Sequence, residues 1–242
     1  MKHKFTLILL TGILLSLGWP TYGFPILLFV ALVPLLDFVQ SNRKTSSRNK
    51  NKIVFIYSYL AFLIWNISTT WWIYNSSVFG AIFAILCNTS FYALLITFYH
   101  WALKHLPRIL ASVFLITLWI SFEKFHLFWD FSWPWLNLGN AFSEHIYWIQ
   151  WYEYTGVFGG TLWVLILNFF FLNCYQVFKN DRSLKNLITK SIPGLFGIAL
   201  PILFSLVIYV NTEEPEAKTE IVLLQPNIDP YQEKYALENE DF

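Results

Sequence analysis

Hydrophobic residues form seven runs along the chain, and shorter polar or turn-forming segments separate these runs. A helix that crosses the hydrocarbon core of a bilayer needs about 20 predominantly apolar residues, and somewhat fewer where flanking side chains reach the interface. The pattern therefore predicts an all-α polytopic membrane bundle with about seven transmembrane helices. They are expected near residues 5–17, 24–39, 53–74, 78–102, 109–122, 157–178 and 192–210.

The first run allows two interpretations, because it follows the basic start Lys2-His3-Lys4, as the apolar part of a secretory signal peptide does. A second apolar run begins after the single turn at residues 18–23, which contains Pro, Gly and two aromatic residues. No small-residue cleavage site stands between the two runs. We therefore favour a helical hairpin over a cleaved signal peptide.

Composition supports a membrane protein. Of the 242 residues, 56% are hydrophobic and 13% are charged, whereas an ordinary soluble domain has about 25% charged residues. These values argue against a soluble globule, a disordered chain, a collagen or a disulfide-stapled secreted domain, and they fit a chain whose outer faces contact lipid. The net charge of +1 gives no overall field that attracts nucleic acid, so we expect membrane lipids, and no nucleic acid, as partners.

The basic residues predict the orientation of the bundle, because cytoplasmic loops retain Lys and Arg. With seven spans, 13 of the 16 Lys and Arg residues fall on one side of the membrane, and only Lys124, Lys218 and Lys234 fall on the other. Adding or removing one helix would destroy this separation. The N-terminus is therefore expected in the cytoplasm, and the segment after residue 210 is expected outside.

The longest outer loop, residues 123–154, is rich in Trp and contains several acidic residues. Aromatic rings concentrate where lipid headgroups meet water, so this loop is expected to lie along the outer interface. An aromatic belt is the simpler interpretation, and a binding groove is the alternative.

Composition changes after residue 210, where an acidic linker at 212–216 precedes a short apolar segment at 219–225 that is typical of a buried strand. A turn at 229–230 and a helical pattern near 231–235 follow. One strand and part of a helix do not make a domain. We therefore predict a transmembrane domain at 1–210, and at 211–242 a linker with the truncated start of an extracytoplasmic α/β domain.

No complete catalytic constellation is present in the sequence. The histidines lack the i, i+4 spacing of a zinc site, and there is no nucleophile elbow or phosphate-binding loop, so we expect no metal and no cofactor. Cys87 and Cys174 lie in apolar runs, where a thiol is a poor nucleophile. Asp37 and Glu123 are weak candidates, because each lies close enough to a predicted membrane edge to be hydrated. Within the spans lie three amides that can bond between helices, those of Asn66, Asn88 and Asn168.

The order of several short strings resembles that of the apolipoprotein N-acyltransferases, a family of bacterial inner-membrane enzymes. The strings are residues 10–20, 29–36, 69–73, 133–139 and 224–228, together with Trp119, Glu123, Gln150, Gly156, Gly159, Gly160 and Asn168. Each string is weak alone, but their order and the seven preceding runs are fairly specific. The resemblance covers essentially the whole chain, and it identifies the final apolar segment as the first strand of a nitrilase-like domain.

The resemblance implies an acyl transfer in two steps. In the family, a Cys thiolate takes an acyl chain from a phospholipid, and the thioester then passes it to the free α-amine of the N-terminal diacylglyceryl-cysteine of an apolipoprotein. A Glu acts as the general base and a Lys stabilises the oxyanion. The expected partners are therefore a phospholipid acyl donor and an apolipoprotein acceptor, and the expected location is the bacterial inner (cytoplasmic) membrane.

The family's Glu, Lys and Cys lie after the first strand, so no residue of this chain takes their roles, and they are expected beyond Phe242. Lys234 and Tyr235 match a Lys–aromatic pair near the mouth of the family's active site, and they are the candidate substrate-binding residues. For Tyr235, packing of the first helix of that domain is an equal alternative.

Acyl transfer by this chain alone is not expected, and three origins stay open: a piece of a longer gene product, a decayed gene or half of a split enzyme. The alternative function is a non-catalytic multi-pass module that binds lipid or assembles with partners. A small transporter is less favoured, because the sequence shows no convincing internal repeat.

Overall fold

The computed structural model describes residues 2–20, 22–43, 50–212 and 221–225. The chain divides into two units, Met1–Val210 and Asn211–Phe242, and each is described by itself. In the second unit the described residues are 211, 212 and 221–225.

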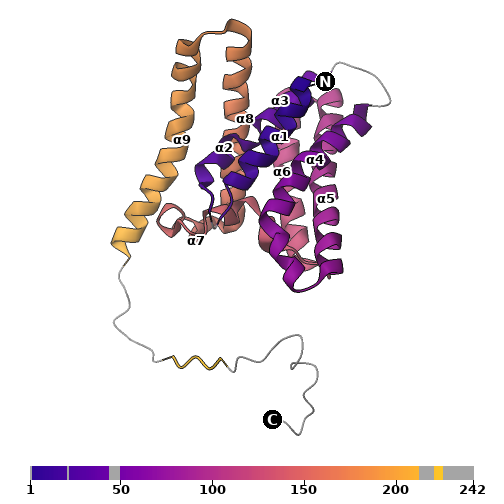
Figure 1. Ribbon diagram of the computed structural model, residues 1–242. Helices are drawn as coiled ribbons and strands as arrows, with labels where there is room; N and C mark the ends of the chain where they lie inside the picture. The colour runs from indigo at the N-terminus through magenta and orange to yellow at the C-terminus, as the bar shows by residue number, and fades with distance from the viewer. Residues whose placement is uncertain (1, 21, 44–49, 213–220, 226–242) are drawn as a thin grey trace. The chain divides into compact units, whose positions relative to one another are not determined.

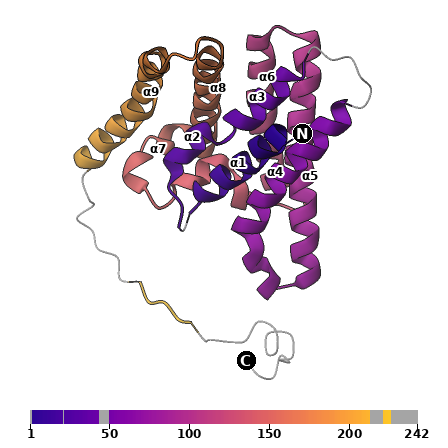
Figure 2. The ribbon, with the colours of Figure 1, turned by 45° about the horizontal axis from the view of Figure 1, so that its top comes forward.

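The first unit is a bundle of helices (Figure 1). Its α-helices are α1 (Lys2–Leu17), α2 (Leu28–Ala31), α3 (Val33–Ser41), α4 (Lys50–Thr70), α5 (Val78–His105), α6 (Arg108–Phe128), α7 (Tyr152–Thr155), α8 (Val157–Asp181) and α9 (Leu184–Asn211). Short 3-10 helices lie between them, at η1 (Pro25–Leu27), η2 (Trp71–Asn75), η3 (Pro134–Leu136), η4 (Leu138–Phe142) and η5 (Ile146–Trp148). Figures 1 and 2 show α8 and α9 side by side at one edge of the bundle.

Among the described residues, five helices are long and apolar enough to cross a membrane. They are Asn51–Asn75, Val78–His105, Arg108–Phe128, Val157–Asp181 and Leu184–Asn211, which confirms five of the predicted spans. The first two predicted spans are shorter apolar helices, Phe5–Leu17 and Pro25–Ser41. The chain is therefore a helical, multi-pass membrane protein, and its count of seven spans stays a prediction.

The second of these short segments is interrupted between α2 and α3, and the side chain of Asn168 from α8 lies at the interruption. Its amide donates to the Leu28 carbonyl at 2.7 Å, and its Oδ1 accepts from the Leu32 N–H at 2.8 Å. In a continuous α-helix these two backbone groups would bond to each other. The one hydrogen bond that the α2–α3 segment lacks is thus replaced by two hydrogen bonds to the Asn168 side-chain amide. These two bonds fix α8 against the α2–α3 break.

Aromatic rings form the centre of the core. Trp65 of α4, Tyr92 of α5 and Trp119 of α6 are buried, and the ring centroids of Tyr92 lie 5.2 Å from those of both Trp residues. Such pairs contribute about 0.5–1.5 kcal/mol each beyond the burial of their area. The Tyr92 hydroxyl also donates to the Leu136 carbonyl at 3.0 Å, so the core is tied directly to the long loop that follows α6.

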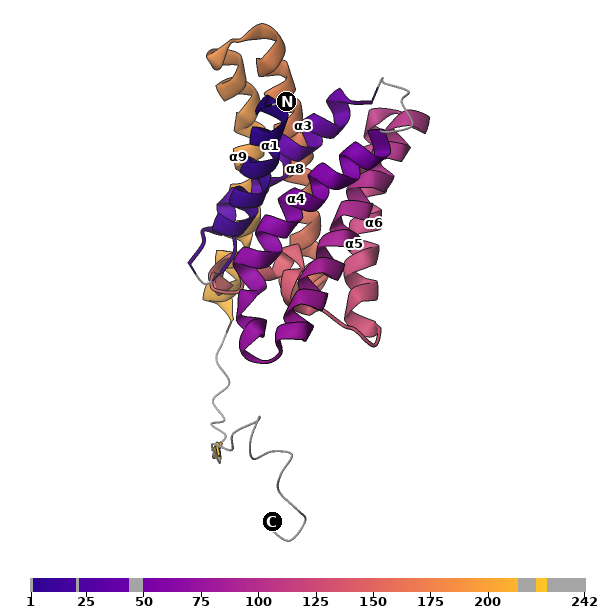
Figure 3. The same ribbon diagram turned by 45° about the vertical axis from the view of Figure 1, so that its right-hand side comes forward.

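The two ends of the first unit differ in composition. The start of α1 and the α8–α9 turn lie at one end, and the α4–α5 turn and α7 lie at the other (Figures 1 and 3). The first is called the basic end, because the helices begin or end there beside Arg43, Lys104, Arg108, Lys179, Arg182 and Lys185. The opposite end, which carries residues 129–156, is called the loop end.

In the second unit, the described segment Ile221–Gln225 forms neither helix nor strand. The strand predicted at 219–225 is therefore not formed there, because a strand requires a hydrogen-bonded partner and the described residues provide none. The predicted turn at 229–230 and the helical pattern near 231–235 lie outside the described residues.

Candidate functional site

Glu123 lies in the last third of α6, near the loop end, and its side chain is fully buried. Its Oε1 accepts hydrogen bonds from the Trp119 indole N–H at 3.1 Å and from the Leu138 backbone N–H at 2.9 Å. Its Oε2 accepts from the Thr161 hydroxyl at 2.6 Å. One carboxylate thereby joins its own helix, the η4 segment of the loop and the start of α8.

The Thr161 hydroxyl extends this network back to the loop. Its oxygen accepts from the Gly139 backbone N–H at 3.1 Å while its hydrogen is donated to Glu123. A hydroxyl can donate and accept at once, so both groups are satisfied without water. Within the described part of the chain Glu123 forms no ion pair, and its role in this arrangement is to hold the loop against α6 and α8.

Two glycines allow the loop to approach α8 closely. A Cβ atom on Gly139 would lie 2.0 Å from the Val157 carbonyl oxygen, and one on Gly160 would lie 1.7 Å from the Tyr152 hydroxyl oxygen. That hydroxyl donates to the Gly139 carbonyl at 3.0 Å. Burial, and secondly the nearby Glu123 carboxylate, raise the pKa of the Tyr152 phenol above its ordinary value, so it stays a hydrogen-bond donor at neutral pH.

An apolar groove of about 730 Å³ lies next to this network, between α7, α8 and α9. It begins at the loop end beside Trp151 and Tyr154 and continues along the spans past Leu162, Ile166 and Leu200. Trp163, Pro201 and Phe204 also line it. We call it the α8–α9 groove.

Two of the contacts that attach the α9 wall of this groove to the bundle are polar hydrogen bonds near the groove itself. Trp163 donates its indole N–H to the Gly197 carbonyl at 2.7 Å, and the Gln150 backbone N–H donates to the Ser205 hydroxyl at 2.5 Å. Only Gly194 and Ser205 of the described α9 residues are buried. The groove therefore lies between a well-packed helix, α8, and a helix, α9, most of whose described side chains are not buried by the rest of the bundle.

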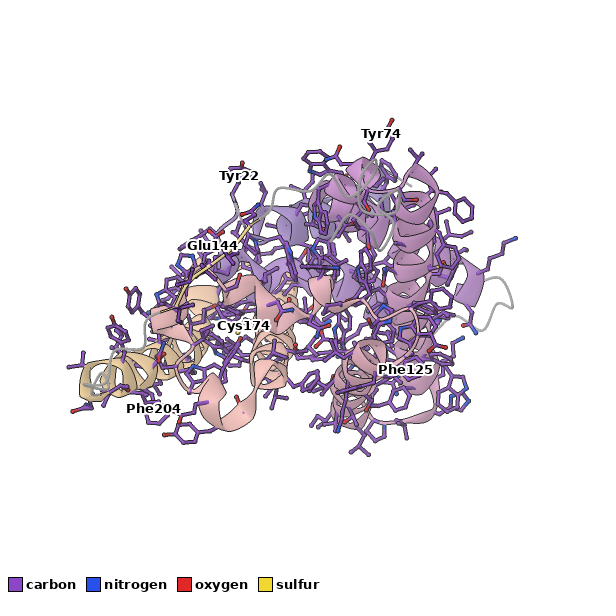
Figure 4. The ribbon with its side chains drawn as sticks, turned by 90° about the horizontal axis from the view of Figure 1, so that it is seen from below. Tyr22, Tyr74, Phe125, Glu144, Cys174 and Phe204 are labelled. Carbon is purple, nitrogen blue, oxygen red and sulfur yellow. The ribbon has the colours of Figure 1, made fainter. Side chains whose placement is uncertain are left out.

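A second hollow of about 490 Å³ at the same end lies between the α1–η1 turn and the end of α4. Trp19, Tyr22, Thr69 and Trp72 line it, so it is partly polar. Figure 4 views the molecule from the loop end and shows Tyr22 and Tyr74 at the rim of the bundle, pointing away from its centre. Exposed aromatic side chains at the end of the spans are typical of a membrane–water interface.

Comparison with known proteins identifies the family. Residues 11–170 match the sequence profile of the family described as "Apolipoprotein N-acyltransferase N-terminal domain". The chain belongs to this family. A curated apolipoprotein N-acyltransferase of Chlorobaculum tepidum is 26% identical over 237 residues, which are 96% of this chain and 43% of that protein. The chain thus spans less than half the length of this relative. No solved structure matches the chain.

The family resemblance inferred from the sequence is confirmed, and the structure brings several of its strings together. Glu123, Gly139 and Gly160 meet at the loop end, and Trp119 donates to Glu123. The predicted substrate-binding residues, Lys234 and Tyr235, lie outside the described residues.

The expectation that Glu123 is hydrated was wrong, whereas Asp37 lines a polar cavity at the basic end and pairs there with a lysine. Glu123 is fully buried, and Asp37 is 2% exposed, with Lys179 of α8 lying 2.8 Å from its carboxylate.

Two of the three asparagines within the spans donate hydrogen bonds inside their own helices. Asn66 donates to the Phe62 carbonyl and Asn88 to the Ala84 carbonyl. Asn88 also contacts His126 at 2.7 Å.

Sequence reasoning missed the roles of Thr161, Tyr152 and Trp163. Thr161 and Trp163 stand among apolar residues of a predicted span, where a hydroxyl or an indole gives no sign of its partner. The signal in the sequence that could have indicated a close approach here is the set of glycines in the resemblance strings, including Gly139 and Gly160, because a glycine has no Cβ.

Proposed function

We propose that this chain is the membrane part of an apolipoprotein N-acyltransferase. In this function an acyl chain passes from a phospholipid, through a thioester acyl-enzyme, to the N-terminal diacylglyceryl-cysteine of a lipoprotein. Family membership supports the proposal, together with the match over nearly the whole chain to a longer N-acyltransferase. The catalytic Glu, Lys and Cys belong to a nitrilase-like domain, whose start we place at residues 211–242.

The proposed setting is the bacterial inner membrane, with seven spans and a cytoplasmic N-terminus. The short helices α1 and η1–α3 then form the first two spans, with Asn168 satisfying the backbone groups at the break. The grouping of basic residues at one end of the bundle supports this orientation, because it makes the basic end cytoplasmic. The segment 211–242 then follows α9 on the extracytoplasmic side.

The observation that carries the proposal is the α8–α9 groove. Its lining is almost wholly apolar, it reaches Trp151 and Tyr154 at the loop end, and it lies on α8 and α9 within the spans. An acyl chain is the apolar ligand that a bilayer presents in such a position. The groove would hold the acyl chain of a phospholipid in the outer leaflet, with the headgroup beside Trp151 and Tyr154. Lys234 and Tyr235 would then contact substrate near the mouth of the active site.

A photo-cross-linking experiment tests the groove. The protein is reconstituted in lipid nanodiscs with a phosphatidylethanolamine whose acyl chain carries a diazirine, and cross-linked peptides are mapped by mass spectrometry. Adducts are expected on residues that line the groove. Leu200→Trp fills the groove and should reduce them, whereas Leu203→Trp should not, because Leu203 is a similarly exposed leucine of α9 outside the groove. Equal labelling in both variants would contradict the assignment.

Acyl transfer itself is tested in cells depleted of their own apolipoprotein N-acyltransferase. The gene is expressed with its natural downstream sequence, and the N-terminal peptides of a lipoprotein are analysed for the third acyl chain. The appearance of triacylated peptides supports the enzymatic function. Persistent diacylated peptides, together with groove-specific cross-links, would favour the alternative of a non-catalytic lipid-binding module.

A further inference from the structure

A polar cavity of about 260 Å³ lies at the basic end of the bundle, opposite the loop end. Helices α3, α6 and α8 provide its lining, which includes Asp37, Gln40, Arg108, Gln176 and Lys179. Most of its surface is polar, in contrast to the α8–α9 groove.

The cavity carries one positive charge that the described residues do not neutralise. Lys179 is paired with the buried Asp37 at 2.8 Å, so these two charges cancel. No carboxylate in the described ranges lies within ion-pairing distance of Arg108, whose side chain is exposed at the start of α6. A guanidinium presents several N–H donors in a planar fork that matches phosphate oxygens.

Two amides in the cavity are held in fixed positions and keep donors available. Gln176 donates to the Oε1 of Gln40 at 2.8 Å, and Gln40 donates to the Tyr99 hydroxyl at 2.7 Å. An amide group has two N–H donors, and each of these glutamines uses one of them in the relay. The relay fixes both amides beside Arg108, so the cavity combines a cation with preorganised neutral donors.

A mostly apolar groove continues from this cavity along the predicted spans α6 and α8. This second groove, of about 500 Å³, shares Gln40, Arg108 and Gln176 with the cavity. It runs between α6 and α8 as far as Ile116 and Ile166, and we call it the α6–α8 groove. From Arg108 to Ile116 an α-helix rises by about 12 Å, which approaches the roughly 15 Å thickness of the hydrocarbon in one leaflet.

We propose that this cavity and the α6–α8 groove together bind an anionic phospholipid in the leaflet at the basic end of the bundle. The phosphate contacts Arg108 and the two glutamine amides, and one acyl chain lies along α6 and α8. The unneutralised charge of Arg108 explains the preference for an anionic headgroup, and the continuity of a cationic cavity with an apolar groove requires an amphiphile. This site has its polar part at the basic end, shares only Ile166 with the proposed outer-leaflet substrate groove, and does not rest on the acyltransferase proposal.

Retention of lipid by the purified protein tests this site. The full chain is reconstituted in nanodiscs of phosphatidylethanolamine with a minor fraction of phosphatidylglycerol, extracted into detergent and washed, and the retained lipids are quantified by mass spectrometry. The wild-type protein should be enriched in phosphatidylglycerol relative to the nanodisc. Arg108→Gln should lower the retention of phosphatidylglycerol about five-fold, because one interfacial cation contributes about that factor to the binding of an anionic lipid. Lys185→Gln removes an exposed cation of the same end that does not line the cavity, and it should leave retention unchanged.

A second pair of variants tests the apolar groove. Val113→Trp fills the groove and should reduce the retention of phosphatidylglycerol, whereas Leu110→Trp should not, because Leu110 is an equally exposed residue of α6 outside the groove. Retention without a preference for the anionic lipid would overturn the proposal. So would equal retention by Arg108→Gln and Lys185→Gln, or by Val113→Trp and Leu110→Trp.

Discussion

The indole N–H of Trp163 donates to the Gly197 carbonyl at 2.7 Å, and Pro201 explains why that carbonyl can accept it. In a regular helix the N–H of residue 201 would bond to the carbonyl of residue 197, but proline has no N–H. The proline therefore exposes an acceptor on α9, and a tryptophan of α8 uses it. This pairing positions the wall of the α8–α9 groove.

A double-mutant cycle tests this relationship. Trp163→Phe removes the donor and should lower the free energy of unfolding by about 1 kcal/mol beyond the loss of packing. Pro201→Ala restores an N–H that can bond to the Gly197 carbonyl within the helix. In the Pro201→Ala background, Trp163→Phe should therefore lower the free energy of unfolding by about 0.5–1 kcal/mol less than it does in the wild type. The reason is that the Gly197 carbonyl then has the N–H of the introduced alanine as a partner and no longer depends on the indole. Strictly additive effects in a denaturant titration in mixed micelles would contradict the pairing.

The Glu123 network predicts an order of stability among variants. Glu123→Ala leaves the Trp119, Leu138 and Thr161 donors unpaired in a buried site, and each buried unpaired group costs about 1–3 kcal/mol. Glu123→Gln should cost less, because its Oε1 can still accept from Trp119 and Leu138 while its amide donates to the Thr161 oxygen. Unfolding titrations should therefore rank the wild type above Glu123→Gln and Glu123→Ala last.

Thr161 offers an independent check on the same network. Thr161→Val keeps the shape but leaves the Glu123 Oε2 and the Gly139 N–H unpaired, so it should destabilise the fold by about 2–4 kcal/mol and expose the loop to protease. Thr161→Ser retains the hydroxyl and should stay close to the wild type. Equal protease sensitivity in the two variants would show that the hydroxyl does not hold the loop.

The sequence predicted those features that depend on neighbours along the chain. Five long spans were predicted because an apolar run of sufficient length needs no distant partner to be recognised. The Trp-rich loop was predicted in the same way, but its expected start at residue 123 was wrong, because α6 continues to Phe128. The site was predicted less well, because its contacts join distant positions. Glu123 bonds to groups 15 and 38 residues away, and Asn168 bonds to Leu28, 140 residues away. No local pattern indicates which donor a buried carboxylate will meet.

Asn168 shows the same limit and supports a further prediction. Asn168→Ala leaves the Leu28 carbonyl and the Leu32 N–H without their partner, so it should lower the free energy of unfolding by about 2–3 kcal/mol. Asn173→Ala is the matched control, because Asn173 is an exposed asparagine on the same helix. If both variants unfold at the same denaturant concentration, the bridging amide does not stabilise the α2–α3 break.

The Asp37–Lys179 pair predicts a strongly non-additive result. Asp37 is buried, whereas the Lys179 side chain is 40% exposed, so the carboxylate depends on the lysine more than the lysine depends on the carboxylate. Lys179→Met would leave a buried charge without a partner and should cost about 3 kcal/mol, the lower part of the range for a broken buried pair, because solvent partly screens this one. Asp37→Asn alone should lower the free energy of unfolding less, because an amide is neutral and can be hydrogen-bonded.

The double variant Asp37→Asn/Lys179→Met should recover most of the stability lost in Lys179→Met, since it removes the uncompensated charge. A double variant no more stable than Lys179→Met alone would show that Lys179 stabilises α8 through packing of its aliphatic chain instead of through the carboxylate.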